Sequence, residues 1–213
     1  LELDKPLGGA FRPMANDVVC NFYDWTAGAI DVFTGSFTAN DLVDNGLYGS
    51  YYVNPGGVIN LTNMNGYVDR RGEIYNYGGT INIYSNAAYG DSYWPFNNNG
   101  SITMTGGVVD FKNVGVLVYN TGAYTLTENI SGGTIRTTGG FMVERGDFTP
   151  AGGTVEFYGA SDGNFHTING GTVNNILVNK DIVDESVTGS AVTYNRESGV
   201  ISDVPMASTI TVD

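Results

Sequence analysis

The sequence has little of what many catalytic centres and disulfide-stabilised domains need. Cys20 is its only cysteine, so no intramolecular disulfide can form, and we interpret it as an inert, small apolar residue. His166 is its only histidine, which excludes a histidine-based catalytic triad and a metal site built from several histidines. A strand position facing outward is the simple interpretation of His166.

Basic residues and long apolar runs are scarce as well. The chain carries 9 Lys and Arg against 22 Asp and Glu, a net charge of −13. Nucleic acids and anionic membranes are therefore excluded as partners, because clustered basic side chains bind phosphate. No run of 18 apolar residues occurs, so no membrane insertion is expected. The chain starts at Leu1 without a signal peptide and stops inside an alternating run at 208–212, so we expect a piece of a longer polypeptide.

Glycine, in contrast, is abundant, at 31 of 213 residues. A Gly-Gly doublet precedes a short alternating segment at six places, spaced 18 to 28 residues apart. The six doublets begin at Gly56, Gly78, Gly106, Gly132, Gly152 and Gly170. Repeats of this length, each too small to bury a core of its own, are typical of a solenoid.

Aligning the repeats on their doublets shows an alternation of period two. The apolar positions are Ile59, Ile81, Val109, Ile135, Val155 and Val173, and each is followed by a polar residue: Asn60, Asn82, Asp110, Arg136, Glu156 and Asn174. Such alternation indicates strands with one buried face. We predict an all-β, right-handed parallel β-helix with irregular coils of about 18–28 residues and glycines at a corner. We predict that residues 1–213 form one β-helix segment of a longer protein, with residues 1–26 as a candidate cap or irregular coil.

Three of the outward residues carry charges that alternate in sign. Asp110, Arg136 and Glu156 would be neighbours on successive coils, about 4.8 Å apart. We interpret them as a surface charge ladder that contributes a few tenths of a kcal/mol per pair. The alternative is the cleft of an enzyme that cleaves acidic polysaccharides. A column of threonines (Thr80, Thr134, Thr154, Thr172) raises ice binding, but the charges beside it disfavour that function.

An aromatic tract lies within the longest repeat. Its candidate binding residues are Tyr84, Tyr89, Tyr93, Trp94 and Phe96. An insertion in a solenoid usually emerges as a loop on one face, and exposed Tyr and Trp offer rigid contact area to a sugar or a protein. The alternative is that the rings fold back over the edge of the core.

Acidic residues gather near the N-terminus, around Asp24, Asp31, Asp41, Asp44 and Asn45. Carboxylates and amides in loops can hold calcium, but the spacing matches no calcium-binding pattern, so we interpret them as solvated turn residues. We therefore predict no metal site, no cofactor and no catalytic residue, with calcium as the open alternative. The tripeptide Arg145-Gly146-Asp147 invites an integrin-binding interpretation, on a match too short to carry it.

The later repeats resemble those of very large surface proteins of Bacteroidetes. The resemblance rests on Phe-Thr-Pro-Ala-Gly-Gly-Thr-Val-Glu-Phe-Tyr-Gly at 148–159 and Gly-Gly-Thr-Val-Asn-Asn-Ile-Leu-Val-Asn at 170–179. It is clear over about residues 100–180 and nearly absent from 1–50. It implies export by the type IX secretion system, display on the cell surface and a role in adhesion or gliding motility. No catalytic residue comes with it.

Together these observations predict a non-catalytic structural or adhesive segment of a secreted surface protein. Its partners would be the secretion machinery and surface glycans or another protein. The alternatives are a β-helix that binds or cleaves polysaccharides and a passive spacer or export cargo.

Overall fold

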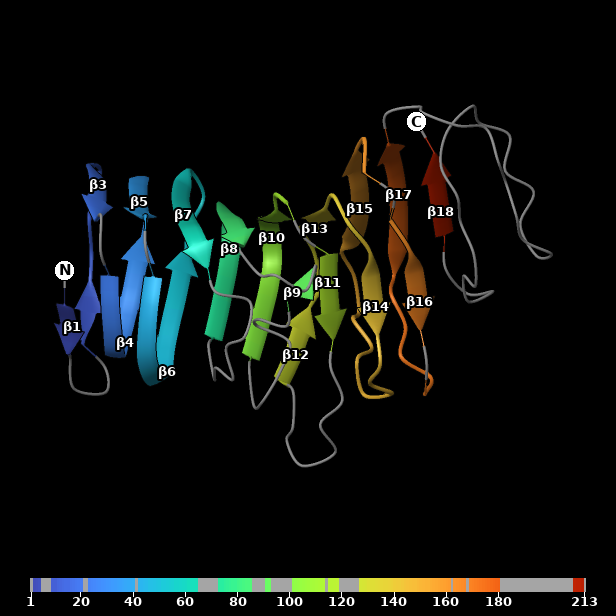
Figure 1. The fold of residues 1–213 in the computed structure, drawn as a ribbon, viewed down its shortest axis with the longest axis horizontal. Coiled ribbons are helices and arrows are strands. Elements are labelled where there is room, and N and C mark those ends of the chain that lie inside the picture. Colours follow the sequence, from blue (N-terminus) through green and yellow to red (C-terminus); the bar gives the residue numbers. More distant parts are fainter. Residues whose placement is uncertain are drawn as a thin grey trace.

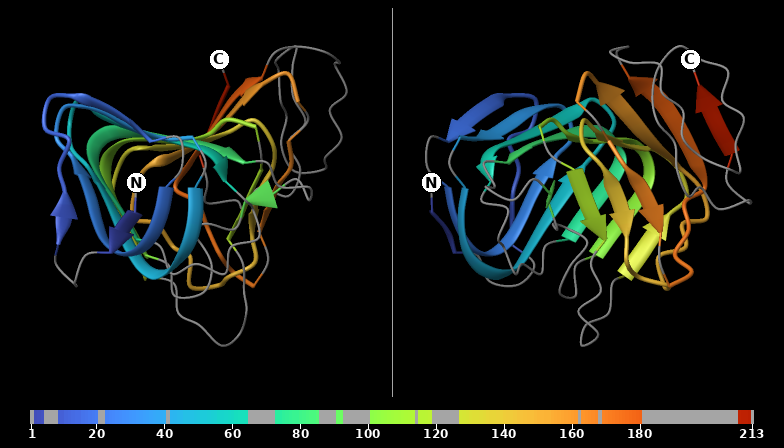
Figure 2. Two further views of the ribbon diagram at one scale, coloured as in Figure 1. Left: turned by 60° about the vertical axis from the view of Figure 1, so that its left-hand side comes forward. Right: turned by 45° about the vertical axis from the view of Figure 1, so that its right-hand side comes forward.

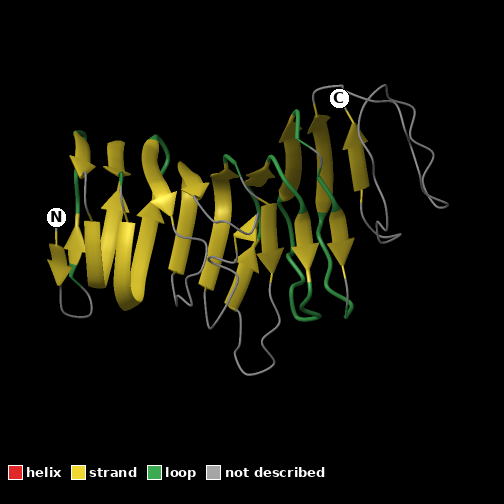
Figure 3. Cartoon of the chain, in the orientation of Figure 1, coloured by secondary structure: helices red, strands yellow, loops and turns green. Residues whose placement is uncertain are grey.

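The computed structural model is a row of parallel strands that runs from the N-terminus to the C-terminus (Figure 1). It describes residues 2–4, 9–20, 23–40, 42–64, 73–85, 91–92, 101–113, 115–118, 127–161, 163–167, 169–180 and 209–212. At 2–4, 23–27, 42–49, 63–64, 85, 91–92 and 209–212 only the backbone is described. All regular elements in this part of the chain are strands (Figure 3), and none of it forms a helix that could span a membrane.

The strands line three faces of the coil. The first face holds β2 (Ala10–Phe11), β4 (Tyr23–Val32), β6 (Leu42–Val53) and β12 (Thr127–Ile130), and β1 (Glu2–Asp4) pairs with the start of β4. The second face holds β3 (Asp17–Cys20), β5 (Gly35–Ala39), β7 (Gly57–Met64), β13 (Thr134–Thr137), β15 (Thr154–Gly159), β17 (Asn175–Lys180) and β18 (Thr209–Val212). The third is a separate sheet of β9 (Asp91–Ser92), β11 (Gly115–Val118), β14 (Phe141–Val143) and β16 (Phe165–Thr167).

Two long strands turn the corner between the first and second faces. β8 (Glu73–Ser85) pairs with β6 through its first half and with β7 through its second half. β10 (Ser101–Phe111) pairs with β12 and then with β13 in the same way. Figure 2 shows the strands bending from one face into the next. We call this bend the first corner.

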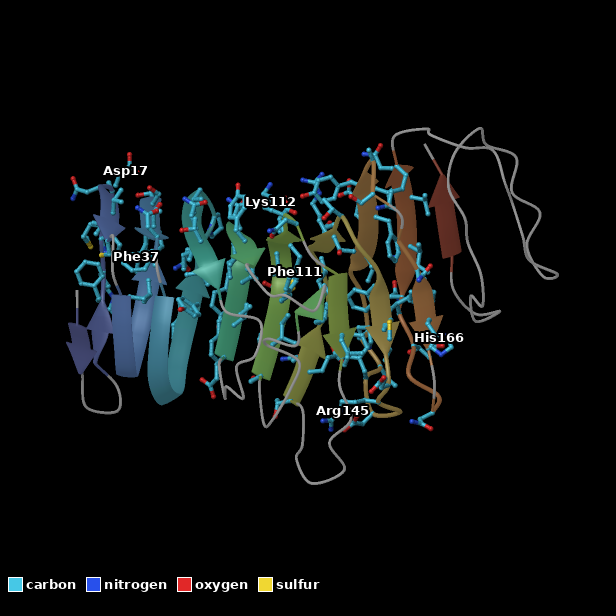
Figure 4. The ribbon with its side chains drawn as sticks, viewed as in Figure 1. Asp17, Phe37, Phe111, Lys112, Arg145 and His166 are labelled. Carbon is cyan, nitrogen blue, oxygen red and sulfur yellow. The ribbon has the colours of Figure 1, made fainter. Side chains whose placement is uncertain are left out.

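The predicted core column is present on the inner side of the second face. Paired residues on successive strands are Phe37, Ile59, Ile81, Val109, Ile135, Val155 and Ile176, and all are buried. Figure 4 labels Phe37 of this column. It also labels Phe111, which belongs to the neighbouring inward column. Burial of each large apolar side chain stabilises the fold by about 1.5–3 kcal/mol. The parallel β-solenoid is thereby confirmed; its right-handed sense stays a prediction.

Glycines at the first corner serve the role that was predicted for them. Gly107 has φ +75°, and a Cβ atom there would lie only 2.2 Å from the carbonyl oxygen of Gly79 on the preceding coil. The fully buried side-chain amide of Asn76 forms hydrogen bonds at the corner. The Oδ1 atom of Asn76 accepts hydrogen bonds from the backbone N–H groups of Gly78 and Gly79, each at 3.0 Å. Its Nδ2 atom donates to the carbonyl oxygen of Val108 at 3.0 Å.

The sixth doublet, however, was aligned wrongly. The structure pairs Val155 with Ile176 and Glu156 with Leu177, so Val173 and Asn174 do not occupy the predicted columns. Gly171 lies against the preceding coil at another corner, where a Cβ atom would approach the carbonyl oxygen of Arg145 to 2.3 Å. At the first corner of this coil the amide of Asn175 donates to the carbonyl oxygen of Gly153 at 3.0 Å. An asparagine side chain thus satisfies a backbone group there.

Candidate functional site

The predicted charge ladder forms on the outer side of the second face. Asp110 on β10 pairs with Arg136 on β13, and Arg136 pairs with Glu156 on β15. The Nη1 atom of Arg136 donates to Oδ2 of Asp110 at 3.2 Å, and its Nε atom lies 2.7 Å from Oε2 of Glu156. The three residues are therefore neighbours on successive coils, as the alternation predicted.

Two further side chains close over this ladder. The Nζ atom of Lys112 donates to Oδ2 of Asp110 at 2.5 Å. The hydroxyl of Tyr158 donates to Oδ1 of Asp110 at 2.7 Å, and the guanidinium carbon of Arg136 lies 4.2 Å from the centre of the Tyr158 ring. Burial, followed by the hydrogen bond to Asp110 and the charge of Asp110, raises the pKa of Tyr158. We call Asp110, Lys112, Arg136, Glu156 and Tyr158 the charge cluster.

Burial makes the charge cluster different from the surface ladder that was predicted. The side chain of Asp110 is only 2% exposed and that of Glu156 11%, whereas Arg136 is 29% exposed. A buried carboxylate that loses its partner costs several kcal/mol, far more than an exposed pair contributes. The sequence interpretation missed Lys112 and Tyr158. The alternation could have predicted both residues, because each stands two positions after an outward carboxylate and therefore points to the same side of the sheet.

All four carboxylate oxygens of the charge cluster already contact a side chain of the protein. Oδ1 of Asp110 accepts from Tyr158, and Oδ2 accepts from Lys112 and Arg136. Both oxygens of Glu156 contact Arg136, and Oε1 also accepts from Asn179 at 3.3 Å. A general base must reach a substrate proton, whereas each of these oxygens lies against a cationic or hydrogen-bonding side chain of the protein. The arrangement is suited to holding strands in register.

A hydrogen-bonded row of uncharged side chains precedes the charge cluster on the same outer surface. The amide of Asn60 donates to the hydroxyl of Thr38 at 3.0 Å, and the amide of Asn82 donates to Oδ1 of Asn60 at 2.8 Å. Asn82 pairs with Asp110 on the next strand, so the row leads into the charge cluster. Successive coils are therefore linked by side chains as well as by backbone hydrogen bonds.

Only the start of the aromatic tract lies in the described part of the chain. Tyr84, near the end of β8, is 40% exposed. The backbone N–H of Lys112 donates to the carbonyl oxygen of Ile83 at 2.9 Å, which places Tyr84 beside the charge cluster. The other tract residues, Tyr89, Tyr93, Trp94 and Phe96, lie outside the described residues. A ligand site in the tract therefore stays a prediction.

The acidic set near the N-terminus is described at Asp31. Its Oδ2 atom accepts from Nε of Arg12 at 2.8 Å, and its Oδ1 atom accepts from the amide of Asn54 at 3.2 Å. Asp41 and the side chains of Asp24, Asp44 and Asn45 lie outside the described residues. Among the side chains that the structure does place, no three His, Cys, Asp or Glu residues are grouped so that they could hold a metal ion.

The Arg145-Gly146-Asp147 tripeptide forms a closed turn. Arg145 is only 5% exposed, and its Nε and Nη2 atoms donate to the two carboxylate oxygens of Asp147 at 2.8 and 2.6 Å. The hydrogen bond from Arg145 lowers the pKa of Asp147. The turn lies on the opposite margin of the solenoid from Lys112 (Figure 4). A receptor would find the guanidinium group already occupied, which disfavours the integrin interpretation.

The two single residues that the sequence singled out have ordinary surroundings. His166 is half-buried on β16, where it pairs with Met142 of β14. Cys20 is a half-buried free thiol that packs against the apolar core.

In comparisons with known proteins, no family model matches the chain, and neither a curated protein nor a solved structure matches it.

Proposed function

We propose that this chain is a structural and adhesive β-solenoid segment of a larger secreted surface protein, without catalytic activity. The observation that carries the proposal is the charge cluster. It gathers two carboxylates, two cations and a phenol at one place, yet the carboxylate oxygens of Asp110 and Glu156 all contact cluster side chains or Asn179. Such a cluster stabilises a stack of coils, which is what a rigid surface segment needs.

The partners and the location follow from the resemblance of residues 148–179 to repeats of bacterial surface proteins. Under this proposal the secretion machinery exports the protein, and its outer surface contacts glycans or another protein. The net charge of −13 favours uncharged or cationic ligands over acidic ones. A glycan array read both for bound protein and for newly formed reducing ends tests the proposal. Binding without sugar release is expected, and release of sugar from any glycan rejects it.

Cleavage of a polysaccharide is the second candidate. One observation favours it: Lys112, Arg136 and Tyr158 lie together on an outer face beside the exposed Tyr84. Basic and aromatic side chains of this kind can bind a sugar chain and transfer protons. If this candidate were correct, Asp110→Asn would abolish sugar release from a polysaccharide that the parent protein cleaves, at unchanged glycan binding. A structural cluster predicts lower stability and no release from either protein.

A further inference from the structure

One position at the first corner, counted back along the sequence from the second face, is exposed in seven successive coils, although a bulge in β10 pairs Tyr77 with Gly106. It lies three residues before the aligned second-face residues Asp17, Ser36, Val58, Thr80, Val108, Thr134 and Thr154. The residues at this position are Met14, Phe33, Pro55, Tyr77, Thr105, Ser131 and Ala151, and all seven are exposed. We call them the corner column. In five of the coils this residue directly precedes a Gly-Gly doublet.

The corner column changes character halfway along the solenoid. In the first four coils it holds the large apolar or aromatic residues Met14, Phe33, Pro55 and Tyr77, which we call the apolar ridge. Met14 is 60% exposed, Phe33 47% and Tyr77 42%. The next three coils carry only Thr105, Ser131 and Ala151. Corner geometry alone therefore does not demand large side chains at this position.

The coils that carry the apolar ridge are tightly stacked at the corner. A Cβ atom on Gly35 would lie 2.6 Å from the carbonyl oxygen of Asn16 in the coil before it. A Cβ atom on Gly78 would lie 3.0 Å from Cγ of Pro55. With successive strands about 4.8 Å apart, the four coils that carry these residues span about 15 Å along the stack. The ridge is one side chain wide.

The backbone of Met14 is a second, independent feature of the ridge. Its φ is +60°, in the left-handed region that non-glycine residues avoid. The other described non-glycine residue of this kind is Asn169, whose short polar side chain tolerates the conformation. A methionine held there with most of its side chain in solvent is unfavourable for folding, and such strain gathers at functional positions.

Area and charge decide between the possible occupants of the ridge. Its exposed side chains offer roughly 300 Å², whereas a stable protein partner buries about 800 Å² on each side. A second copy of the chain would also bring another net charge of −13 to the contact. The ridge itself is uncharged, and the nearby Arg12 and Asp31 are paired with each other at 2.8 Å. The occupant is therefore narrow, linear and neutral.

We propose that the apolar ridge binds a neutral β-linked polysaccharide laid along the stack of coils. The rise from one coil to the next is close to the length of one sugar residue in such a chain. Successive residues of the glycan would therefore meet equivalent positions, with the apolar faces of the sugars against Phe33 and Tyr77. Thr34, exposed in the same corner turn as Phe33, offers a hydroxyl for the sugar hydroxyls. This inference rests on the proposed adhesive function and names its ligand and surface.

Affinity electrophoresis tests whether the apolar ridge binds a neutral polysaccharide, because the acidic protein migrates well in a native gel. The gels contain hydroxyethylcellulose, a mixed-linkage β-glucan or a galactomannan, with polygalacturonate as the anionic counterpart. Retardation is expected in at least one neutral gel and none in polygalacturonate. The double variant Phe33→Thr/Tyr77→Thr should weaken the retardation about tenfold or more. Thr105→Tyr, which adds an aromatic ring in the next coil at the bulge beside Tyr77, should strengthen it.

Ser131→Ala, at the same position of the corner column in a coil without an apolar residue, is the matched control and should bind as the parent does. Thermal unfolding of each variant checks that binding changes are not folding changes. Absence of retardation in every neutral gel overturns the inference, as does undiminished retardation of the folded double variant. In the second case the adhesive function survives, with its ligand at another surface. Sugar release would instead reject the proposed function and leave the ridge as a binding surface.

Discussion

Tyr158 donates a hydrogen bond of 2.7 Å to Asp110, a residue 48 positions earlier in the chain. The contact passes over Arg136, so it joins β10 to β15 across the intervening strand β13. A single side chain thus connects three successive coils from the outside.

Removal of the Tyr158 hydroxyl tests this connection. Tyr158→Phe keeps the ring over Arg136 but leaves Oδ1 of the buried Asp110 without its donor. We expect the free energy of unfolding in urea to fall by about 1–2 kcal/mol. Tyr77→Phe, an exposed tyrosine, serves as the control and should change it by less than about 0.5 kcal/mol. Equal effects of the two substitutions would show that the Tyr158 hydrogen bond does not hold the coils together.

Arg136 is the central residue of the charge cluster and should have the larger effect. Arg136→Gln leaves Glu156 and Asp110 with fewer partners in buried surroundings, and we expect a loss of about 3 kcal/mol in the free energy of unfolding. Arg12→Gln removes one partner of Asp31, but the Asn54 amide still donates to that carboxylate and the Arg12 side chain is 55% exposed, so its loss should be clearly smaller. Denaturant unfolding of both variants measures the difference. A loss below about 1 kcal/mol for Arg136→Gln would contradict the structural role.

Two glycines with positive φ allow the cost of the left-handed backbone to be measured apart from the cost of a steric clash between coils. Gly107 has φ +75° and no room for a Cβ atom, whereas Gly170 has φ +85° and nothing within 4 Å of one. Gly170→Ala should cost about 1–2 kcal/mol from the left-handed backbone alone. Gly107→Ala should cost clearly more or prevent folding, because the coils must separate at that corner. Circular dichroism and urea titration measure both, and equal costs would contradict the corner geometry.

These examples also show what the sequence could and could not predict. Alternation was enough for the column from Ile59 to Val155 and for the pairing of Asp110, Arg136 and Glu156, because each depends on local period and coil spacing. The doublet Gly170-Gly171 was misplaced because a Gly-Gly pair can serve any corner. The contact of Tyr158 with Asp110 could not be predicted from the alternation, because it depends on how coils two apart in the stack lie over one another. The corner column could be found in the sequence as the residue before five of the doublets, but its first two members, Met14 and Phe33, precede no doublet.

Met14 should show opposite effects on stability and binding. Met14→Asn places a residue that tolerates positive φ at a strained turn, so the free energy of unfolding should rise by about 0.5–1 kcal/mol. The same substitution removes one end of the apolar ridge, and retardation by neutral polysaccharide should weaken. Thermal unfolding and affinity electrophoresis of the same preparation measure the two effects. A variant that is more stable and binds equally well would remove Met14 from the binding surface.

A stacked tyrosine pair on the first face makes the fold sensitive to high pH. The rings of Tyr52 and Tyr75 are nearly parallel with centres 4.5 Å apart, and the Tyr75 hydroxyl donates to Oε2 of Glu73 at 3.2 Å. Burial and then the charge of Glu73 raise the pKa of Tyr75 to about 12. The neutral phenol is therefore favoured in the folded state. Its contribution to stability is complete below about pH 10 and lost as the pH rises toward 12.

Alkaline titration of phenolate absorbance, in the parent and in Tyr75→Phe, checks this expectation. The variant should lack one late-titrating group and should lose less stability between pH 10 and 12. If Tyr75 ionises at the ordinary pKa of a tyrosine, close to pH 10, the stacked and hydrogen-bonded arrangement is not maintained in solution.

The central claim is that the charge cluster serves the stack of coils and not a reaction. Its most direct test is the release of new reducing ends when the purified protein is incubated with polygalacturonate, alginate and the neutral polysaccharides of the binding experiment. The account predicts no release above a buffer blank, even from a polysaccharide that retards the protein. Release that disappears in a folded Asp110→Asn variant would contradict it.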